Sequence, residues 1–182
     1  TSVSRQALFS GELPFHFADS IHTTQKEAAL WQLFWEQQGV PKGRVSFQKG
    51  LGQGVYQPEQ IEGVRHPHIQ VAGLVIDTLD RLMHRALQGY KGFLAEIDIW
   101  LQGGYLIRLI QDLLDQGYDL YLTSDHGNTE SVGIGRINEG VLADQRGERV
   151  RIYRDKNLRD QAAQQYSSIP WPQIALPQDW FV

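Results

Sequence analysis

Residues 118–130 read YDLYLTSDHGNTE, and the interpretation of the whole chain starts from this stretch. Its first part, residues 118–123, is rich in aromatic, apolar and β-branched side chains, which predicts a strand. The strand is expected to stop before Asp125 and His126, and Gly127 then allows the backbone to turn. Carboxylates and imidazoles are common metal ligands, and ligands of open α/β sheets bind at the carboxyl ends of the strands. A polar turn after a strand is the alternative interpretation.

A second acid–imidazole pair follows another apolar run. Residues 69–76, IQVAGLVI, are nearly continuously apolar, as expected for a strand buried on both faces of a parallel sheet. Asp80 and His84 come next, and a spacing of four places them on one face of a helix, where they can hold one metal ion. Asp77 is a reserve ligand, and its preferred role is the cap of that helix. Because the two pairs each follow a strand of a parallel sheet, we predict that they meet at one sheet edge.

The remaining patterns predict an α/β fold. The strand–helix–strand order, with a crossover long enough for a right-handed connection, is typical of a parallel sheet. We therefore expect a predominantly parallel β-sheet flanked by helices, in a single domain over residues 1–182. The helices are expected over residues 1–11, 24–38, 93–116 and 157–165, and the strands over 44–48, 69–76, 118–123 and 148–154. Thr24 and Glu27 are expected to form a capping box, and the helix over 93–116 is expected to break at its two central glycines.

The composition favours a packed domain and excludes several kinds of site. The chain has 182 residues, of which 41% are hydrophobic, so wholesale disorder is excluded. The absence of cysteine excludes disulfides, thiolate metal sites and cysteine nucleophiles. The net charge of −4 excludes an overall basic field that would recruit nucleic acid. No signal peptide or membrane helix is visible, so we expect a cytoplasmic protein without a membrane partner. The chain starts without methionine, and we expect a fragment or a processed chain.

Three side chains could bind or attack a phosphate group. A hydroxyl at a helix N-terminus lies near free N–H groups at the positive end of the helix dipole, where it can hold or attack a phosphate. Thr1 has this place, and a simple helix cap is the alternative. Arg149 and Arg151 alternate along residues 148–154 and could neutralise a phosphodiester. A charged edge strand is the alternative for the arginines.

Two further motifs carry less weight. Residues 49–63 begin with KGLGQG, which has neither the spacing of a P-loop nor that of a dinucleotide fingerprint, so they predict a flexible loop. His66 and His68 flank Pro67 and could share a face of a strand. They precede the strand over 69–76 at its N-terminal end, which favours a structural or surface role.

Taken together, these motifs resemble those of the alkaline phosphatase superfamily. The shared layout is a helix that begins with Thr1, followed by an Asp-x-x-x-His pair and an Asp-His-Gly motif. Within that superfamily, the stretches TSVSRQALFSG, VIDTLDRLMH, YLTSDHGNTE and GERVRIYRD resemble the PglZ domain of bacterial phage-defence systems of the BREX and phage growth limitation types. The resemblance covers nearly the whole chain and implies an alkaline-phosphatase-like core.

The resemblance also implies a chemistry. Asp80 and His84 match the ligands of one divalent ion, and Asp125 and His126 match those of a second ion and the shared site. The ions are expected to be zinc, with manganese or magnesium as alternatives. Thr1 fits the nucleophile or metal-bridging hydroxyl. The implied activity is metal-dependent phosphoryl-transfer hydrolysis, by a phosphodiesterase, nuclease or phosphatase. The implied partners are a phosphate ester, with DNA among the candidates, and other phage-defence proteins.

Two departures from the superfamily pattern leave alternatives open. The superfamily usually has an aspartate on a strand upstream of the nucleophile, and the sequence contains no such strand. We therefore expect it to be the C-terminal portion of a PglZ domain. The superfamily also usually has a third histidine, and none follows His126. A catalytically degenerate module that assembles defence proteins is the alternative function. A phosphoglycerate-mutase-like enzyme shares both pairs but not the other stretches.

Overall fold

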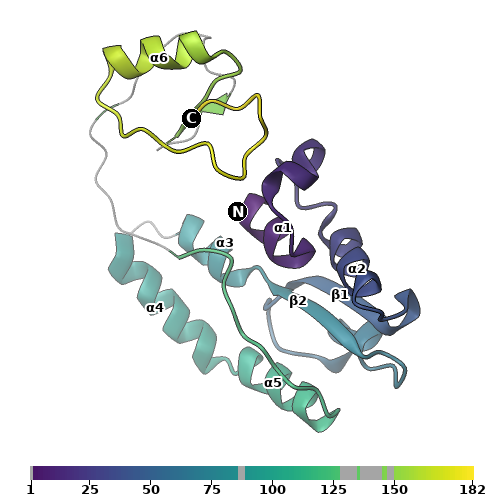
Figure 1. The fold of residues 1–182 in the computed structure, drawn as a ribbon. Coiled ribbons are helices and arrows are strands. Elements are labelled where there is room, and N and C mark those ends of the chain that lie inside the picture. Colours follow the sequence, from purple (N-terminus) through teal and green to yellow (C-terminus); the bar gives the residue numbers. More distant parts are fainter. Residues whose placement is uncertain (1, 86–88, 128–134, 136–144, 147–149) are drawn as a thin grey trace.

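The computed structural model describes residues 2–85, 89–127, 135, 145, 146 and 150–182 (Figure 1). It is a mixed α/β structure, as predicted. Its helices are α1 (Ser2–Ser10), α2 (Glu27–Gln37), α3 (Thr78–Arg85), α4 (Gly89–Gln102), α5 (Tyr105–Asp115) and α6 (Lys156–Gln165), with 3-10 helices η1 (Pro14–Ser20), η2 (Lys42–Arg44) and η3 (Pro58–Val64). Its strands are β1 (Val45–Leu51), β2 (Val71–Ile76), β3 (Gln145–Arg146) and β4 (Arg151–Ile152).

β1 and β2 form the predicted parallel sheet, which has two strands among the residues described. Their register shifts between Gln48 and Leu51, near the carboxyl ends of both strands. Gly52 follows this irregularity with a φ of +95°, and a Cβ there would lie 2.7 Å from the hydroxyl of Thr78. Only glycine allows this backbone conformation and this close approach without strain. The end of β1 is therefore held directly against the start of α3.

Helices cover both faces of this sheet (Figure 1). On one face, α1 packs on α2 and α2 packs on β1. The aromatic stripe of α2 lies in this contact: Trp31 meets Phe9 edge-on at a centroid distance of 5.5 Å and donates its indole N–H to the carbonyl of Ser46 at 3.0 Å. Phe9 meets Phe47 of β1 at 4.9 Å. The aromatic side chains of α2 are half-buried, and none of them belongs to the clusters of fully buried apolar residues in the described part of the chain.

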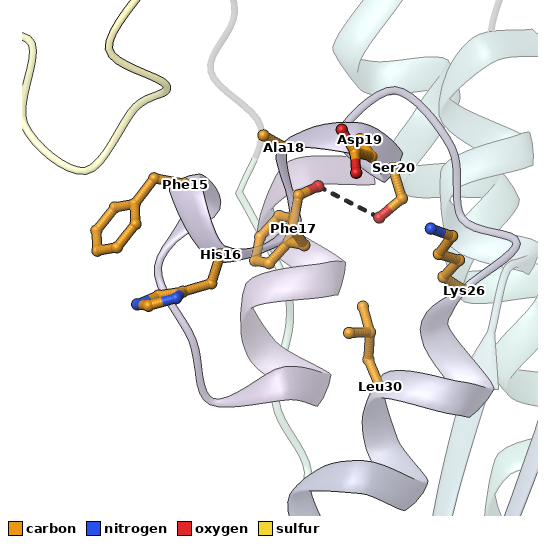
Figure 2. Close-up of a pocket in the computed structure, with 8 residues that line it drawn as sticks. All are labelled: Phe15, His16, Phe17, Ala18, Asp19, Ser20, Lys26 and Leu30. Atoms are coloured by element: carbon orange, nitrogen blue, oxygen red, sulfur yellow. Dashed lines mark hydrogen bonds between the residues drawn. The ribbon is translucent and has the colours of Figure 1, made fainter.

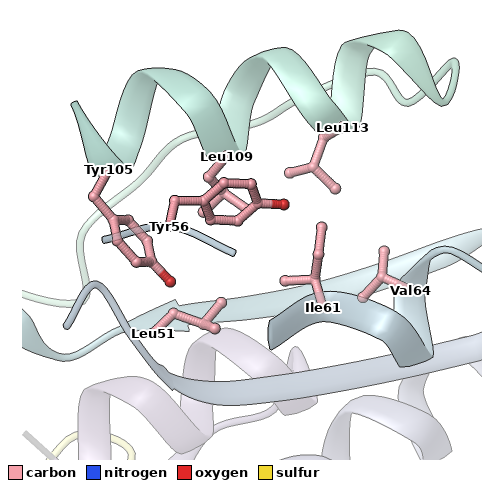
Figure 3. Close-up of a cluster of buried hydrophobic side chains, with 7 residues drawn as sticks. All are labelled: Leu51, Tyr56, Ile61, Val64, Tyr105, Leu109 and Leu113. Carbon is pink, nitrogen blue, oxygen red and sulfur yellow. The ribbon is translucent and has the colours of Figure 1, made fainter. Parts of the chain in front are cut away.

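The opposite face is covered by α5 and η3, which enclose the main apolar core (Figure 3). Tyr105 is the largest fully buried side chain, and its hydroxyl donates to the amide oxygen of Gln60 at 2.8 Å. The buried members of this core are Leu51, Tyr56, Ile61, Val64, Tyr105, Leu109 and Leu113. The break predicted at the two glycines is confirmed, because α4 ends at Gln102 and α5 follows Gly104, whose φ is +72°.

Residues 118–123 do not form the predicted strand. Tyr118 is anchored, since its hydroxyl donates to the carbonyl of Val64 at 2.9 Å. Beyond it the side chains turn to solvent, and Tyr121 and Leu122 are 95% and 79% exposed. Apolar and β-branched residues favour an extended backbone, but a strand exists only where a neighbour completes its hydrogen bonds. In the described part of the chain, no strand pairs with this segment.

Three smaller predictions also change. Residues 49–63 do not form one free loop, because β1 continues to Leu51 and η3 begins at Pro58. Of the strand predicted over 148–154, residues 148 and 149 lie outside the described part of the structure, and residues 151 and 152 form β4, which pairs antiparallel with β3. The capping box of Thr24 and Glu27 is absent, because α2 begins at Glu27 and no side chain caps its N-terminus. The carboxylate of Glu27 is instead buried against Arg5.

A polar cluster on α5 leads to a prediction about acid stability. Asp112 accepts hydrogen bonds from the hydroxyl of Tyr56, from Arg65 at 2.5 Å and from the amide of Gln116 at 3.0 Å. Burial raises the pKa of the Asp112 carboxyl, but the hydrogen bonds from Tyr56 and Gln116 and the charge of Arg65 outweigh burial, so the pKa is lowered. An acid whose pKa is lower in the folded state stabilises the fold above about pH 4 and loses this effect as the pH falls through the folded-state pKa.

We expect Asp112→Asn to lower the free energy of unfolding by about 1–3 kcal/mol at pH 7, since it weakens a charge-assisted hydrogen-bond network. The deficit should shrink at pH 3, where the wild-type carboxyl is increasingly protonated. Urea unfolding at both pH values measures this. Asp115→Asn, at an exposed position of the same helix, is the matched control and should change stability by less than about 0.5 kcal/mol. An equal deficit at the two pH values contradicts the prediction.

Candidate functional site

The two predicted acid–imidazole pairs follow β2 and the segment over 118–123. Asp80 lies in the first turn of α3 and is exposed, and His84 lies in the last turn of the same helix. The side chain of His84, like all of Thr1 and Arg149, is outside the part of the structure that is described. Arg151 lies half-buried in β4 and donates to the carbonyl of Val150 at 3.2 Å.

Asp125 and His126 form a close, half-buried pair. A carboxylate oxygen of Asp125 lies 3.7 Å from Nε2 of His126, and the two side chains are 22% and 31% exposed. Nδ1 of His126 lies 3.1 Å from the carbonyl oxygen of Gly127. When Nδ1 carries the proton, it donates to this carbonyl, and Nε2 keeps its lone pair for a metal ion. A hydrogen bond of this kind, from the second ring nitrogen to a backbone carbonyl, commonly orients metal-binding histidines.

The charge state of Asp125 also suits a metal ligand. An aspartate carboxyl has an ordinary pKa of about 4, well below neutral pH. The carboxyl is therefore ionised at neutral pH, as a ligand must be. Ligand atoms in zinc sites lie about 2.0–2.2 Å from the ion, so one oxygen and one nitrogen 3.7 Å apart are close enough to share a cation.

The described side chains do not join the two pairs into one site. Among them, no group of three or more His, Cys, Asp or Glu residues is close enough to hold a metal ion. The side chain of His84 is not among the described side chains. The structure thus brings Asp125 to His126 and places Asp80 and His84 on one short helix. The convergence of all four residues, and the roles of Thr1, Arg149 and Arg151, stay predictions.

An ion-pair cluster at the carboxyl ends of β1 and β2 was not predicted. Arg5 of α1 donates to Glu27 at 2.7 Å and to Asp77 at 3.2 Å. The second carboxylate oxygen of Asp77 accepts the backbone N–H of Gly50 at 2.8 Å. Both oxygens of Asp77 are thus used by Gly50 and Arg5, rather than for the helix cap predicted. No sequence signal links these residues, since they are spread over four elements.

Glu27 is the least exposed member of this cluster. Its side chain is 0% exposed, against 19% for Arg5. Burial raises the pKa of Glu27, and the positive charges of Arg5 and Lys49 only partly offset burial. One carboxylate oxygen of Glu27 and the Nε of Arg5 are buried without a hydrogen-bond partner. The two side chains therefore meet through a single hydrogen bond, not through a two-point contact.

A surface cavity of about 330 Å³ lies between η1 and α2 (Figure 2). It is bordered by the polar side chains of His16, Asp19 and Lys26 and by the apolar side chains of Phe17 and Leu30, among others. None of the predicted site residues lines it. This cavity therefore gives no support to the predicted chemistry.

Comparison with known protein families gives a match over most of the chain. The profile described as the BREX system PglZ alkaline phosphatase-like domain matches residues 1–175. Neither the curated proteins nor the solved structures include a significant match. None of the helices in the described ranges combines the length and apolar character needed to cross a bilayer. Since the match covers nearly the full length of the chain, the chain belongs to the PglZ family of alkaline phosphatase-like domains of BREX systems.

Proposed function

We propose that this domain is a metal-dependent phosphoryl-transfer hydrolase that acts in bacterial phage defence. The observation that carries the proposal is the Asp125–His126 pair, with an ionised carboxylate and an imidazole whose Nδ1 lies beside a backbone carbonyl. Membership of an alkaline phosphatase-like family agrees with this chemistry. The finer proposal is that the domain acts in the cytoplasm with other defence proteins.

Four residues would hold two divalent cations, which we propose to be zinc, with manganese or magnesium as alternatives. Asp125 and His126 would bind one ion, and Asp80 and His84 would bind the other. Bound divalent ions supply Lewis acidity to a phosphoryl group and lower the pKa of a hydroxyl or water. The Thr1 hydroxyl would give up its proton and attack phosphorus, the bond between phosphorus and the leaving oxygen would break, and the leaving oxygen would take up a proton. Water would then hydrolyse the phosphothreonine, which releases the phosphate and restores the Thr1 hydroxyl.

The preferred substrate is a phosphodiester, with DNA as the candidate polymer. Arg151, and Arg149 beside it in the sequence, would offset the negative charge of the substrate. The charge of the whole chain is −4, so this local pair would have to provide the attraction that the overall field does not.

A degenerate assembly module is the second candidate. It is favoured by one feature of the sequence, because no histidine follows His126 to complete the usual ligand set of the superfamily. In this alternative the Asp–His pairs bind no metal, and the domain serves as a contact surface for other defence proteins.

Metal content and turnover decide between the two candidates. The protein, stripped with chelator and reloaded, is expected to bind about two zinc, manganese or magnesium ions per chain. It should then hydrolyse bis-p-nitrophenyl phosphate faster than p-nitrophenyl phosphate. The stacked surface pair His66 and His68 could retain zinc adventitiously, so a variant with both replaced by alanine is the control and should keep metal and activity. If the protein binds no metal and shows no turnover, the assembly module is the remaining candidate.

A further inference from the structure

We propose that Arg5 is a positioning residue, which fixes the start of α1 against the start of α3 at the carboxyl end of the sheet. This inference rests on the proposed function, because Thr1 and Asp80 are the residues that it would align. Arg5 lies in the second turn of α1, the helix that Thr1 precedes in the sequence. Asp77, its partner, directly precedes α3 and lies three residues before Asp80.

The contacts of Arg5, directly and through Asp77, join α1, α2 and β1 at this edge. One guanidinium nitrogen binds Asp77 at 3.2 Å, and the other binds Glu27, the first residue of α2, at 2.7 Å. Asp77 in turn accepts the N–H of Gly50 in β1 at 2.8 Å. The planar guanidinium holds two carboxylates at a fixed mutual angle, which an ammonium group on a flexible chain does not do. Arg5 therefore determines both the distance and the rotation of α1 relative to the strand ends.

The energetics favour orientation over net stability as the role of this cluster. Removing Glu27 and Arg5 from water is costly, and a buried ion pair of imperfect geometry adds little stability compared with apolar side chains of similar volume. The geometry is imperfect here, because one oxygen of Glu27 and the Nε of Arg5 are buried without a hydrogen-bond partner. A cluster of this kind restricts the arrangement of the elements that it joins.

The absence of cysteine allows a direct test by spin labelling. Leu8 on α1 and Leu79 on α3 are 47% and 39% exposed and belong to none of the predicted machinery, so each can be replaced by a labelled cysteine. The distance distribution between the labels is measured in the otherwise unchanged chain and in the Arg5→Lys and Asp77→Asn variants. These conservative changes keep a charge or an acceptor in place, and circular dichroism confirms that each variant folds.

We expect a narrow distribution in the parent and a broadened or shifted one in both variants. In the unlabelled enzyme, the same variants should lower kcat about 10- to 100-fold with little change in KM, because small misplacements of reacting groups cost up to about 10²-fold. Asp179→Asn, which removes the exposed partner of Arg154, is the matched control and should change neither measurement.

A distribution that stays narrow in both variants overturns the proposal, whether or not the protein is active. A rise in KM alone, with an unchanged distance distribution, would mean that Arg5 contacts the substrate. That result also overturns the proposal. If the parent shows no turnover while the distribution broadens in the variants, the proposed hydrolase function fails and the alignment of α1 with α3 by Arg5 stands.

Discussion

Replacing Asp125 with alanine is expected to lower metal-dependent hydrolysis by on the order of 10²- to 10³-fold, because a bound cation contributes several kcal/mol to the stabilisation of transition-state charge. Asp125 is the residue whose carboxylate is already ionised beside His126, at 3.7 Å from Nε2. Removing it leaves one imidazole, which cannot hold the ion in place. The measurements are kcat/KM for bis-p-nitrophenyl phosphate and metal content per chain, and both should fall together.

A matched control separates this effect from a general loss of structure. Asp119 lies in the same segment and is exposed, and Asp119→Ala should leave both activity and metal content unchanged. Far-UV circular dichroism of the two variants should match that of the wild type. Full activity in Asp125→Ala would remove the main support for the hydrolase proposal. Equal losses of activity and metal in the two variants would show that the segment containing both residues matters as a whole.

Replacing Arg5 with alanine is expected to lower the free energy of unfolding by about 3–5 kcal/mol, the usual effect of breaking a buried ion pair from one side. The reason is Glu27, whose side chain is 0% exposed and which would remain in the interior without a counter-charge. Urea unfolding at pH 7 measures the loss. Asp179→Ala, which removes an exposed partner of Arg154, is the control and should cost no more than about 1 kcal/mol.

A second variant tests the physical reason. Glu27→Gln in the Arg5→Ala background should recover part of the lost stability, because the buried group is then uncharged. Acid should act in the same direction. Burial raises the pKa of Glu27 in the folded state. An acid of this kind contributes most stability below its unfolded-state pKa, and this contribution is lost as the pH rises through the folded-state pKa. The deficit of Arg5→Ala should therefore narrow on acidification. If neither Glu27→Gln nor acid reduces the stability deficit of Arg5→Ala, lost packing and not charge explains that deficit.

Much of the local structure could be predicted from the sequence. The apolar run over 69–76 predicts β2, and the glycines at 103 and 104 predict the break between α4 and α5. The Asp125–His126 motif is equally local, since neighbouring residues in a short segment stay close in any fold. Residues 118–123 are the exception. Their composition favours an extended chain, but pairing depends on a neighbour, and none of the described strands provides it.

The sequence by itself determined the class of each main element, the two acid–imidazole motifs and, through them, the family to which the chain belongs. Those properties depend on residues within a few positions of one another. Only the tertiary structure decided that Glu27 meets Arg5 instead of capping α2, and that Asp77 serves Arg5 and Gly50. Arg5 is 22 positions from Glu27 and 72 from Asp77, and no periodicity encodes contacts over such distances. The contacts arise because the packing of α1 and α2 on the sheet removes these charged groups from water, where each must find a partner of opposite charge.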